Sequence, residues 1–432
     1  MLLQKPAFLL FYHARAAEAS FGEWLGVLWH GLSLDCTVAG YVTAFPVLVA
    51  LASFWIPLSQ RVWRIVLTVY FSLIALVTAA IFAVDLNLYG YWGFRLDGSV
   101  LIYLSDPGEA LASASWGEVL RQILIMLVYA GAMIWSYRWI LRLFRVEPVP
   151  LRGRIVPTVA TLLIGGLTFL AIRGGVTVAT ANVSKVYFSS NMFLNHAATN
   201  PVFSFLSSVG DNENYAEAYP FFEEERRKTL FEELRGNRPG ADAGTPRLLR
   251  SDRPNVVLIL LESFGRTIMD ETVNGEPVMP NMQRFKREGV WFENFFANSF
   301  RTDRGQVAVL CGFPAQTTMS IMKLPRKSAT LPSLARSLGR EGYRSVFMYG
   351  GDLNFTNQAS FMYSTGWEEL IWQKDMQLDA PTSKWGYADD VVVDLFGDEV
   401  EALGRAEQPF LAGLLTLSSH EPFEVPFAKF DD

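Results

Sequence analysis

The stretch that decides the fold of the second half of the chain is Asn255-Val-Val-Leu-Ile-Leu-Leu-Glu262-Ser263, an unbroken apolar run that ends at a carboxylate. A strand that is apolar on both faces is typical of the interior of a parallel sheet. Forty positions after Glu262, the segment Ser299-Phe-Arg-Thr302-Asp-Arg-Gly305 predicts the start of a helix. Open α/β sheets bind ligands at the carboxyl ends of their strands, and helix N-termini bind anions. Glu262 and Thr302 are therefore predicted to form half of a phosphoryl-transfer metal site.

The composition indicates a membrane protein. Of the 432 residues, 50 % are hydrophobic and only 19 % are charged, which is unusually apolar for a soluble protein. The formal net charge is -6 and no Lys/Arg tract is present, so nucleic acid is not an expected partner. Cys36 and Cys311 are the two cysteines, which gives neither a disulfide framework nor a thiolate metal site.

Four apolar stretches in the first half are each close to the ~20 residues that a helix needs to cross a bilayer. Arginines cluster between the first and second stretch and between the third and fourth, which predicts that both loops are cytoplasmic. Everything after Arg173 is then expected outside the cytoplasm, as is the acidic stretch 85–117. Residues 21–32 have the spacing of an amphipathic helix, either at the membrane surface or packed against the spans. The four predicted spans are residues 36–57, 65–84, 119–137 and 155–172.

After Pro254, short apolar strands alternate with helices, a pattern that predicts an α/β sandwich with a mostly parallel sheet. The segment before it contains an expected amphipathic helix over 220–234 and a Gly/Pro-rich linker. The expected strands of the second half are 255–261, 290–297, 343–349 and 410–417, and the expected helices are 280–288, 303–311, 331–341 and 388–403.

Six short motifs follow one another in the second half, and each is weak evidence by itself. They are Asn255-Val-Val-Leu-Ile-Leu-Leu-Glu-Ser263, Pro280-Asn-Met-Gln-Arg-Phe285, Arg301-Thr-Asp-Arg-Gly305, Tyr349-Gly-Gly-Asp352 with Asn354-Phe-Thr-Asn357, Lys384-Trp-Gly386, and Leu417-Ser-Ser-His-Glu-Pro-Phe423. In this order they resemble the lipoteichoic acid synthase and phosphoglycerol transferase branch of the alkaline phosphatase and sulfatase superfamily.

That resemblance extends over the whole chain. It implies an N-terminal transmembrane α-helical bundle (1–173), an extracytoplasmic linker with an amphipathic helix (174–252), and an extracytoplasmic α/β sulfatase-like domain with a central, mostly parallel sheet (253–432) whose C-terminal part is missing. The implied location is the bacterial cytoplasmic (inner) membrane, crossed several times.

The resemblance implies that Glu262 is a metal ligand, that Thr302 is both a metal ligand and the nucleophile, and that His420 contacts the substrate. Chemistry supports these roles, because a threonine hydroxyl is a poor nucleophile at neutral pH unless a divalent cation stabilises its alkoxide. Oxygen ligands favour Mg²⁺ or Mn²⁺, whereas a histidine ligand would bring Zn²⁺ into contention. No other cofactor is expected.

Further substrate-binding residues are expected around this pair. Arg301 and Arg304 flank Thr302 and could hold phosphate oxygens, and the candidates for the pocket wall and rim are Asp352, Asn354, Lys384, Trp385 and Asp390.

Each assignment has a simpler alternative. Glu262 could cap a helix or form a salt bridge at a strand end, and Thr302 could be only an N-cap. His420 could be a structural histidine of its loop, and either arginine could pair with a surface acid.

The family completes its metal site with an Asp-His pair on a later strand, and no histidine follows His420 in this chain. The chain is therefore expected to be a fragment trimmed at both ends, or the product of a disrupted reading frame, with weak metal binding and little turnover.

Three functions follow from these expectations. The first is a membrane-bound transferase that moves a phosphoglycerol or phosphoethanolamine group from a phospholipid headgroup to an extracytoplasmic glycan or polymer. The second is a sulfatase-like phosphodiesterase that delivers the group to water. The third is an inactive membrane protein that binds lipid headgroups or partners.

Overall fold

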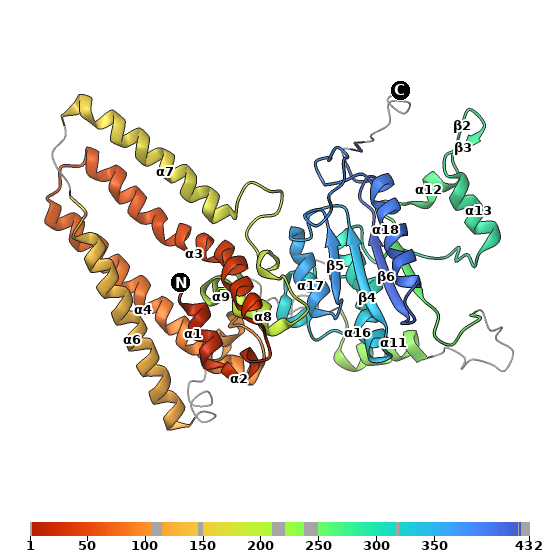
Figure 1. Cartoon of the computed structure of the whole chain (residues 1–432), viewed down its shortest axis with the longest axis horizontal. Helices are drawn as coiled ribbons and strands as arrows, with labels where there is room; N and C mark the ends of the chain where they lie inside the picture. The colour runs from red at the N-terminus through yellow and green to blue at the C-terminus, as the bar shows by residue number, and fades with distance from the viewer. Residues whose placement is uncertain are drawn as a thin grey trace.

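The computed structural model describes residues 2–104, 115–145, 150–209, 221–236, 249–316, 319–421 and 423–424. It has two parts, a bundle of long helices and an α/β domain beside one end of it (Figure 1). Four helices of the bundle are long and apolar enough to cross a membrane, the last together with a preceding 3-10 turn, η2 (Leu151–Arg154). Four spans were predicted, and four are found among the described residues. They are α3 (Phe21–Trp55), α4 (Gln60–Trp92), α6 (Trp116–Leu141) and α7 (Ile155–Arg173).

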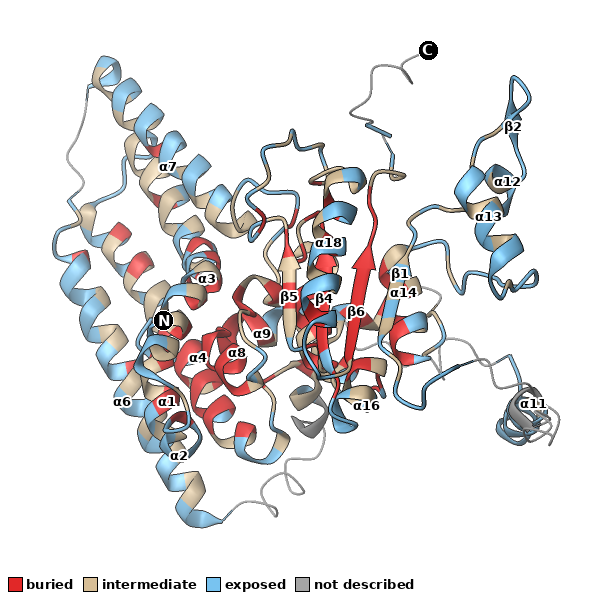
Figure 2. Cartoon of the chain, turned by 45° about the vertical axis from the view of Figure 1, so that its right-hand side comes forward, coloured by how far each residue is buried: buried red, intermediate tan, exposed pale blue. Residues whose placement is uncertain are grey.

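The outer faces of these helices are apolar and open. The helix α4 packs along α6, and α3 packs along α7, while the far sides of α6 and α7 have no neighbour within the described part of the chain (Figure 2). Trp135 of α6 is 72 % exposed and Leu163 of α7 is 68 % exposed. Apolar surface on this scale is stable only against lipid or another apolar surface.

One of the two alternatives for residues 21–32 is excluded, and the expectation for Asp85 is wrong. Residues 21–32 are not a separate surface helix but the first turns of α3, because Ser20 and Glu23 form a capping box that starts the long helix there. Asp85 does not lie in an external loop but inside α4, where it is completely buried. Arg95 pairs with its carboxylate at 3.0 Å, which compensates a charge that would otherwise be costly to bury.

The two loops that carry the arginines lie together at the end of the bundle remote from the α/β domain (Figure 1). Gln60 and Arg64, at the start of α4, both donate hydrogen bonds to the carbonyl of Phe144, which follows α6. At the other end, short helices close the bundle and share one hydrophobic core with α3 and α4. These helices are α1 (Gln4–Phe11), α2 (His13–Ala16), η1 (Gly98–Leu104), η3 (Val183–Val186), α8 (Met192–Ala198) and α9 (Pro201–Ser208).

The α/β domain is built on a parallel four-stranded sheet with strand order β1-β6-β4-β5. Its strands are β1 (Val256–Leu260), β4 (Arg344–Tyr349), β5 (Glu369–Trp372) and β6 (Phe410–Leu415). Side chains alternate between the two faces, so that Phe347 and Tyr349 join the core on one side and Val346 and Met348 join the core on the other. All four strands end at the same edge of the sheet.

Helices cover both faces of this sheet. The helices α14 (Thr302–Cys311), α16 (Leu334–Arg340) and α17 (Gln358–Ser364) contribute to one core, and α18 (Asp389–Gly404) contributes to the other. The remaining elements are α12 (Arg266–Met269), the hairpin β2 (Thr272–Val273) and β3 (Glu276–Pro277), α13 (Pro280–Glu288), η4 (Ile321–Lys323), α15 (Pro325–Ser328) and η5 (Phe355–Asn357).

The expected, mostly parallel α/β sheet is confirmed, but one of the four expected strands is not formed. Three expected strands correspond to β1, β4 and β6, and the four expected helices correspond to α13, α14, α16 and α18. Residues 290–297 form no strand. Phe292, Phe295 and Phe296 in this segment are each more than 70 % exposed. The aromatic run resembles a strand in sequence but has no neighbouring strand to pair with.

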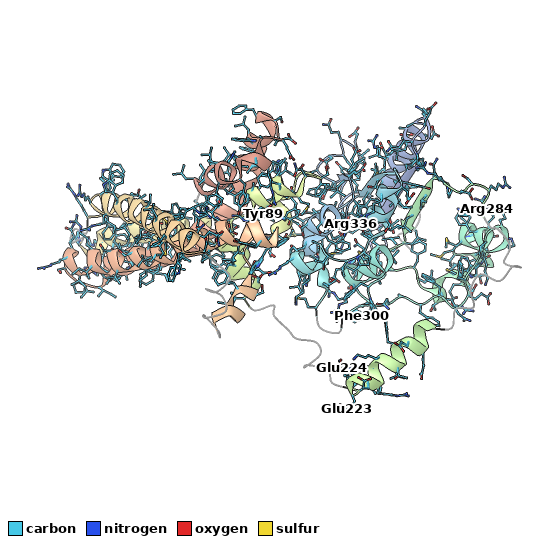
Figure 3. The ribbon with its side chains drawn as sticks, turned by 90° about the horizontal axis from the view of Figure 1, so that it is seen from below. Tyr89, Glu223, Glu224, Arg284, Phe300 and Arg336 are labelled. Atoms are coloured by element: carbon cyan, nitrogen blue, oxygen red, sulfur yellow. The ribbon has the colours of Figure 1, made fainter. Side chains whose placement is uncertain are left out.

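The helix expected over 220–234 is found as α11 (Glu224–Gly236), while Pro220 and the Gly/Pro-rich stretch 237–248 lie outside the described residues. Figure 3 shows Glu223 and Glu224 at its start, well away from Arg336 in the body of the α/β domain. Lys228 pairs with Glu224 at 2.9 Å along the exposed surface of this helix.

Candidate active site

Glu262 and Thr302 meet at the carboxyl edge of the sheet. The chain leaves β1 at Leu260 and places Glu262 two residues beyond it, where its backbone N–H donates a 2.8 Å hydrogen bond to Thr416 Oγ1, just after β6. Thr302 is the first residue of α14. Its Oγ1 donates a 2.8 Å hydrogen bond to Glu262 Oε2. The end of β1, the end of β6 and the N-terminus of α14 thus converge on one carboxylate.

Ser263 gives the chain a sharp turn directly after that carboxylate. Its φ of 58° is in the left-handed region, which is uncommon for a residue other than glycine. Its hydroxyl donates to Glu262 Oε1 at 3.2 Å. Each carboxylate oxygen therefore accepts one hydroxyl, and strained backbone of this kind concentrates at functional sites.

The simpler explanations for this pair do not fit the geometry. The N-cap of α14 is Arg301, and no side chain caps the helix, so the hydroxyl of Thr302 is committed to Glu262. No ion pair to Glu262 occurs among the described residues. The first turn of α14 therefore faces the carboxylate with backbone N–H groups that lack a capping side chain.

The donor set suits a hard divalent cation. Glu262 Oε2 and Thr302 Oγ1 are two oxygen atoms within 2.8 Å of each other. Mg²⁺ is commonly held by one or two protein carboxylates and keeps several water ligands. Within the described ranges, no group of three or more His, Cys, Asp or Glu side chains is placed to hold a metal ion. The pair can supply part of a coordination sphere.

His420 lies in a second group of residues, after the end of β6. Its ring centroid is 4.3 Å from that of Trp385, whose other neighbour is Phe355 at 5.6 Å. His420 Nδ1 and Trp385 Nε1 both lie within hydrogen-bond distance of the carbonyl of Glu421, at 2.9 and 2.8 Å. The two rings thus form one aromatic wall fixed to a single carbonyl.

The loop that carries Trp385 approaches the end of β4 closely. Gly386 has a φ of 144°, and a Cβ atom on it would lie 2.2 Å from the carbonyl oxygen of Gly350. Only glycine fits at this contact, which brings Trp385 over the turn after β4.

Asp352 and Asn354 shape that turn. Asp352 Oδ1 accepts hydrogen bonds from the backbone N–H of Asn354 at 2.9 Å and from its Nδ2 at 2.8 Å. Both residues, together with Trp385, line a cavity of about 630 Å³. Lys185, from the membrane side, also lines it. Burial lowers the pKa of Lys185, against the opposing effect of the Asp352 carboxylate.

The two arginines beside Thr302 differ in their surroundings. Arg301 is about half exposed and its Nε lies 3.4 Å from the buried carboxylate of Asp303. Arg304 is 9 % exposed, and its guanidinium lies 5.8 Å from the ring centroid of Phe300. Neither lines the cavity that contains Asp352 and Trp385; Arg301 lines a different one. The predicted substrate residues therefore fall into separate groups around the edge of the sheet.

Three residues at this edge of the sheet were not predicted from the sequence as part of the site. Thr416 holds the backbone of Glu262, and the carboxylate of Asp389 accepts the N–H groups of Leu417 and Ser418 at 2.7 and 2.9 Å. Tyr349 is buried at the end of β4, and burial together with the charges of Glu262 and other carboxylates raises its pKa. Thr416 follows an apolar strand just as Glu262 does, which is a signal that could have identified it.

Comparison with known proteins identifies the α/β domain. Residues 254–431 match the sulfatase family. The α/β domain, which contains the described part of this segment, is therefore similar to sulfatases and is called the sulfatase domain. Over 183 residues the chain is 36 % identical to phosphoglycerol transferase I from Xanthomonas campestris pv. campestris, a match that covers 39 % of this chain and 26 % of that protein. It is 30 % identical over 191 residues to lipoteichoic acid synthase 1 from Bacillus subtilis, covering 40 % of this chain and 27 % of that protein.

Two solved structures are also similar to the chain. One is a protein in the alkaline phosphatase superfamily from Vibrio parahaemolyticus, 29 % identical, with a TM-score of 0.39 over 43 % of this chain and 45 % of that one. The other is the lipoteichoic acid synthase LtaP from Listeria monocytogenes, 22 % identical, with a TM-score of 0.38 over 40 % and 42 %. The chain spans about a quarter of the length of the curated relatives it matches.

Proposed function

We propose that this protein is a membrane-bound transferase that moves a phosphoglycerol-type group from a phospholipid headgroup to an extracytoplasmic glycan or polymer, with Thr302 as the nucleophile. The observation that carries the proposal is the 2.8 Å hydrogen bond from Thr302 Oγ1 to Glu262 Oε2 at the N-terminus of α14. The names of the relatives, phosphoglycerol transferase I and lipoteichoic acid synthase 1, support the reaction class.

In the first step, Thr302 Oγ1 loses its proton and attacks phosphorus, and diacylglycerol leaves with the oxygen of the broken P–O bond, which takes up a proton. Glu262 Oε2 accepts the hydrogen bond of the attacking hydroxyl and is therefore placed to receive its proton. In the second step, a hydroxyl of the acceptor attacks the same phosphorus and releases Thr302. The backbone N–H groups at the start of α14 are oriented to stabilise the anionic phosphoryl oxygens during both steps.

Glu262 and Thr302 are the residues that would hold the divalent cation on which sulfatase-like enzymes generally depend, and both offer oxygen, the ligand type of Mn²⁺ and Mg²⁺. Such a cation stabilises an alkoxide and offsets charge on the phosphoryl group when bound. His420 and Trp385 are proposed to contact the transferred group from the opposite side of the edge, with Asp352 and Asn354 below them.

The proposed orientation puts the sulfatase domain outside the cytoplasm. Arginines mark cytoplasmic loops, and the two loops that carry them lie at the end of the bundle away from this domain (Figure 1). The catalytic edge would then face a lipid donor in the outer surface of the membrane and an acceptor beyond it.

The proposal is tested with the purified protein in vesicles that contain fluorescent phosphatidylglycerol and Mn²⁺. We expect release of fluorescent diacylglycerol, and we expect Thr302→Ala to reduce its rate by a factor on the order of 10³ or more, because the variant has no attacking oxygen. Thr229→Ala, on the exposed helix α11, removes the same hydroxyl far from the site and should keep the full rate.

An undiminished rate in Thr302→Ala would exclude Thr302 as the nucleophile. Release of free glycerol phosphate with no labelling of an added acceptor would assign the protein to the phosphodiesterases instead of the transferases.

A further inference from the structure

A second cavity, of about 620 Å³, lies where the helix bundle meets the sulfatase domain. It is separate from the cavity of Asp352 and Trp385, although Val178 and Phe355 line both. From the membrane side it is bounded by the segment after α4, by residues 178–183 and by α9; from the other side it is bounded by Arg301, by the chain from η4 into α15, and by η5.

The lining of this junction cavity is strongly cationic. Five cationic side chains contribute to it against one carboxylate, Asp97, in a chain whose overall net charge is negative. The five are Arg95, Arg301, Lys323, Arg326 and Lys327. Charges of one sign gathered in a recess attract a ligand of the opposite sign.

Arg326 forms an ion pair with Asp97, the one carboxylate in the lining. Its Nη1 lies 3.1 Å from Asp97 Oδ1 and 2.5 Å from Ser99 Oγ, and its guanidinium stacks 4.2 Å from the ring centroid of Trp92. Lys323 and Lys327 have no ion pair among the residues that the structure describes. Since Asp303 lies 3.4 Å from Arg301 and Asp85 pairs with Arg95, the positive charge available to a ligand is mainly that of the two lysines.

Arg95 lines the cavity, but its guanidinium lies inside the helix bundle, 4.3 Å from the ring centroid of Phe8. It is 2 % exposed, and Asp85 pairs with its Nη2 at 3.0 Å. Its Nε and Nη1 atoms are buried without a hydrogen-bond partner. Asp85 therefore neutralises Arg95, which forms part of the cavity wall and adds no free charge to it.

The position and the walls of the cavity indicate which class of anion it would bind. Trp92, the last residue of α4, lies beside it, as expected for an aromatic residue at the surface of a membrane. Phe94, Phe203 and Leu324 give the cavity apolar walls next to its cationic ones. A ligand with a phosphate next to hydrocarbon matches both features.

We propose that the junction cavity binds the phosphate-bearing headgroup of an anionic membrane lipid. The site goes beyond the proposed transfer reaction, because its binding groups come from both parts of the chain and include neither Glu262 nor Thr302. A lipid held there would join the helix bundle to the sulfatase domain directly beside Arg301, the residue before Thr302.

The test measures retained lipid by native mass spectrometry of the full chain, extracted from nanodiscs of phosphatidylglycerol or of phosphatidylcholine. We expect a bound phosphatidylglycerol and weaker retention of phosphatidylcholine. Lys323→Gln and Lys327→Gln should each weaken phosphatidylglycerol binding roughly fivefold, since one cationic side chain near a membrane surface contributes about that factor. Both side chains can be changed without exposing a buried charge, so these variants should fold. Lys286→Gln, in α13, is the matched control and should bind as the wild type does.

All variants are repeated in Thr302→Ala, where lipid binding should persist even though transfer is lost. The lipid-site proposal can therefore be tested independently of the proposed transfer reaction. Equal retention of the two lipids, or equal losses in Lys286→Gln and Lys327→Gln, would overturn the site. Displacement of the lipid by an equal concentration of free glycerol phosphate would overturn its assignment to a lipid.

Discussion

At the scale of single residues, the site depends on how one carboxylate is held. Glu262 is fixed through its backbone by Thr416, and its two oxygens accept the hydroxyls of Thr302 and Ser263. A nucleophile is effective only when its approach is set before the substrate arrives. The contact of Thr416 with the backbone of Glu262 therefore supports the proposed reaction by positioning the Glu262 side chain.

Thr416→Val tests this positioning role. The variant keeps the shape of the side chain but removes the oxygen that accepts the N–H of Glu262. We expect kcat for diacylglycerol release to fall roughly 10- to 100-fold, because small misplacements of reacting groups have effects of that size, and KM to change little.

The control for that variant is Thr365→Val. Thr365 is also buried, but its hydroxyl bonds to the carbonyls of Phe361 and Met362 in α17. Both variants should lose about 1–3 kcal/mol of stability through an altered buried hydrogen bond. If both also reduce kcat equally, Thr416 acts only through stability.

At the scale of elements, the sequence predicts the long helices and three of the four strands of the sheet, but it does not predict α17 or short helices such as α8 and α9. The strands β4 and β6 are apolar runs buried on both faces, as their pattern predicts. The run at β1 predicts an interior strand as well, which is wrong, because β1 is an edge strand of the sheet and Val257 and Ile259 are each 47 % exposed. The strand β5 has only four residues and begins at Glu369, which gives too short a pattern to recognise. Residues 290–297 have the aromatic content of a strand but no pairing partner, and pairing is not encoded in local composition.

The site is predictable from the sequence only in part. Glu262 and Thr302 stand at a strand end and a helix start, and these are local features. The contacts of Thr416 and Asp389 instead depend on β6 lying beside β1 and on α18 lying beside the end of β6. Strand order is a property of the whole fold, so it cannot be predicted from the six local motifs.

At the scale of the whole molecule, the two parts of the chain are held together well before the Gly/Pro-rich linker. Asn182 donates a 2.8 Å hydrogen bond to the carbonyl of Asn354, and Ser184 accepts the N–H of Ser360 at 3.0 Å. The segment that contains Asn182 and Ser184 also contributes Val186 to the core at the end of the bundle. These contacts hold the α/β domain beside the helix bundle.

The core at this end of the bundle should make the protein sensitive to acid. His196 is buried, and burial together with the charges of Arg95 and Arg15 lowers its pKa to about 3. Tyr89 and Tyr187 are its aromatic neighbours, and the hydroxyl of Tyr89 lies 3.1 Å from His196 Nδ1. Between the folded pKa and the unfolded value near 6.5, the unfolded chain binds the extra proton, so stability is full above about 6.5 and is lost as pH falls.

We expect the free energy of unfolding to fall by about 2 kcal/mol between pH 7 and pH 5 from this one group. The measurement is thermal unfolding of the detergent-solubilised protein at both pH values. His196→Asn, which cannot take up a proton, should be less stable at pH 7 and less sensitive to pH. An unchanged difference between the two pH values in this variant would show that other groups cause it.

The measurement that tests the central claim most directly is mass spectrometry of the peptide that contains Thr302, after the protein is mixed with phosphatidylglycerol and quenched in acid. The account predicts a phosphoglycerol ester on Thr302, formed before any acceptor is added and absent in Thr302→Ala and Glu262→Gln. Diacylglycerol release with no modified residue, or with the ester on a residue other than Thr302, would contradict it.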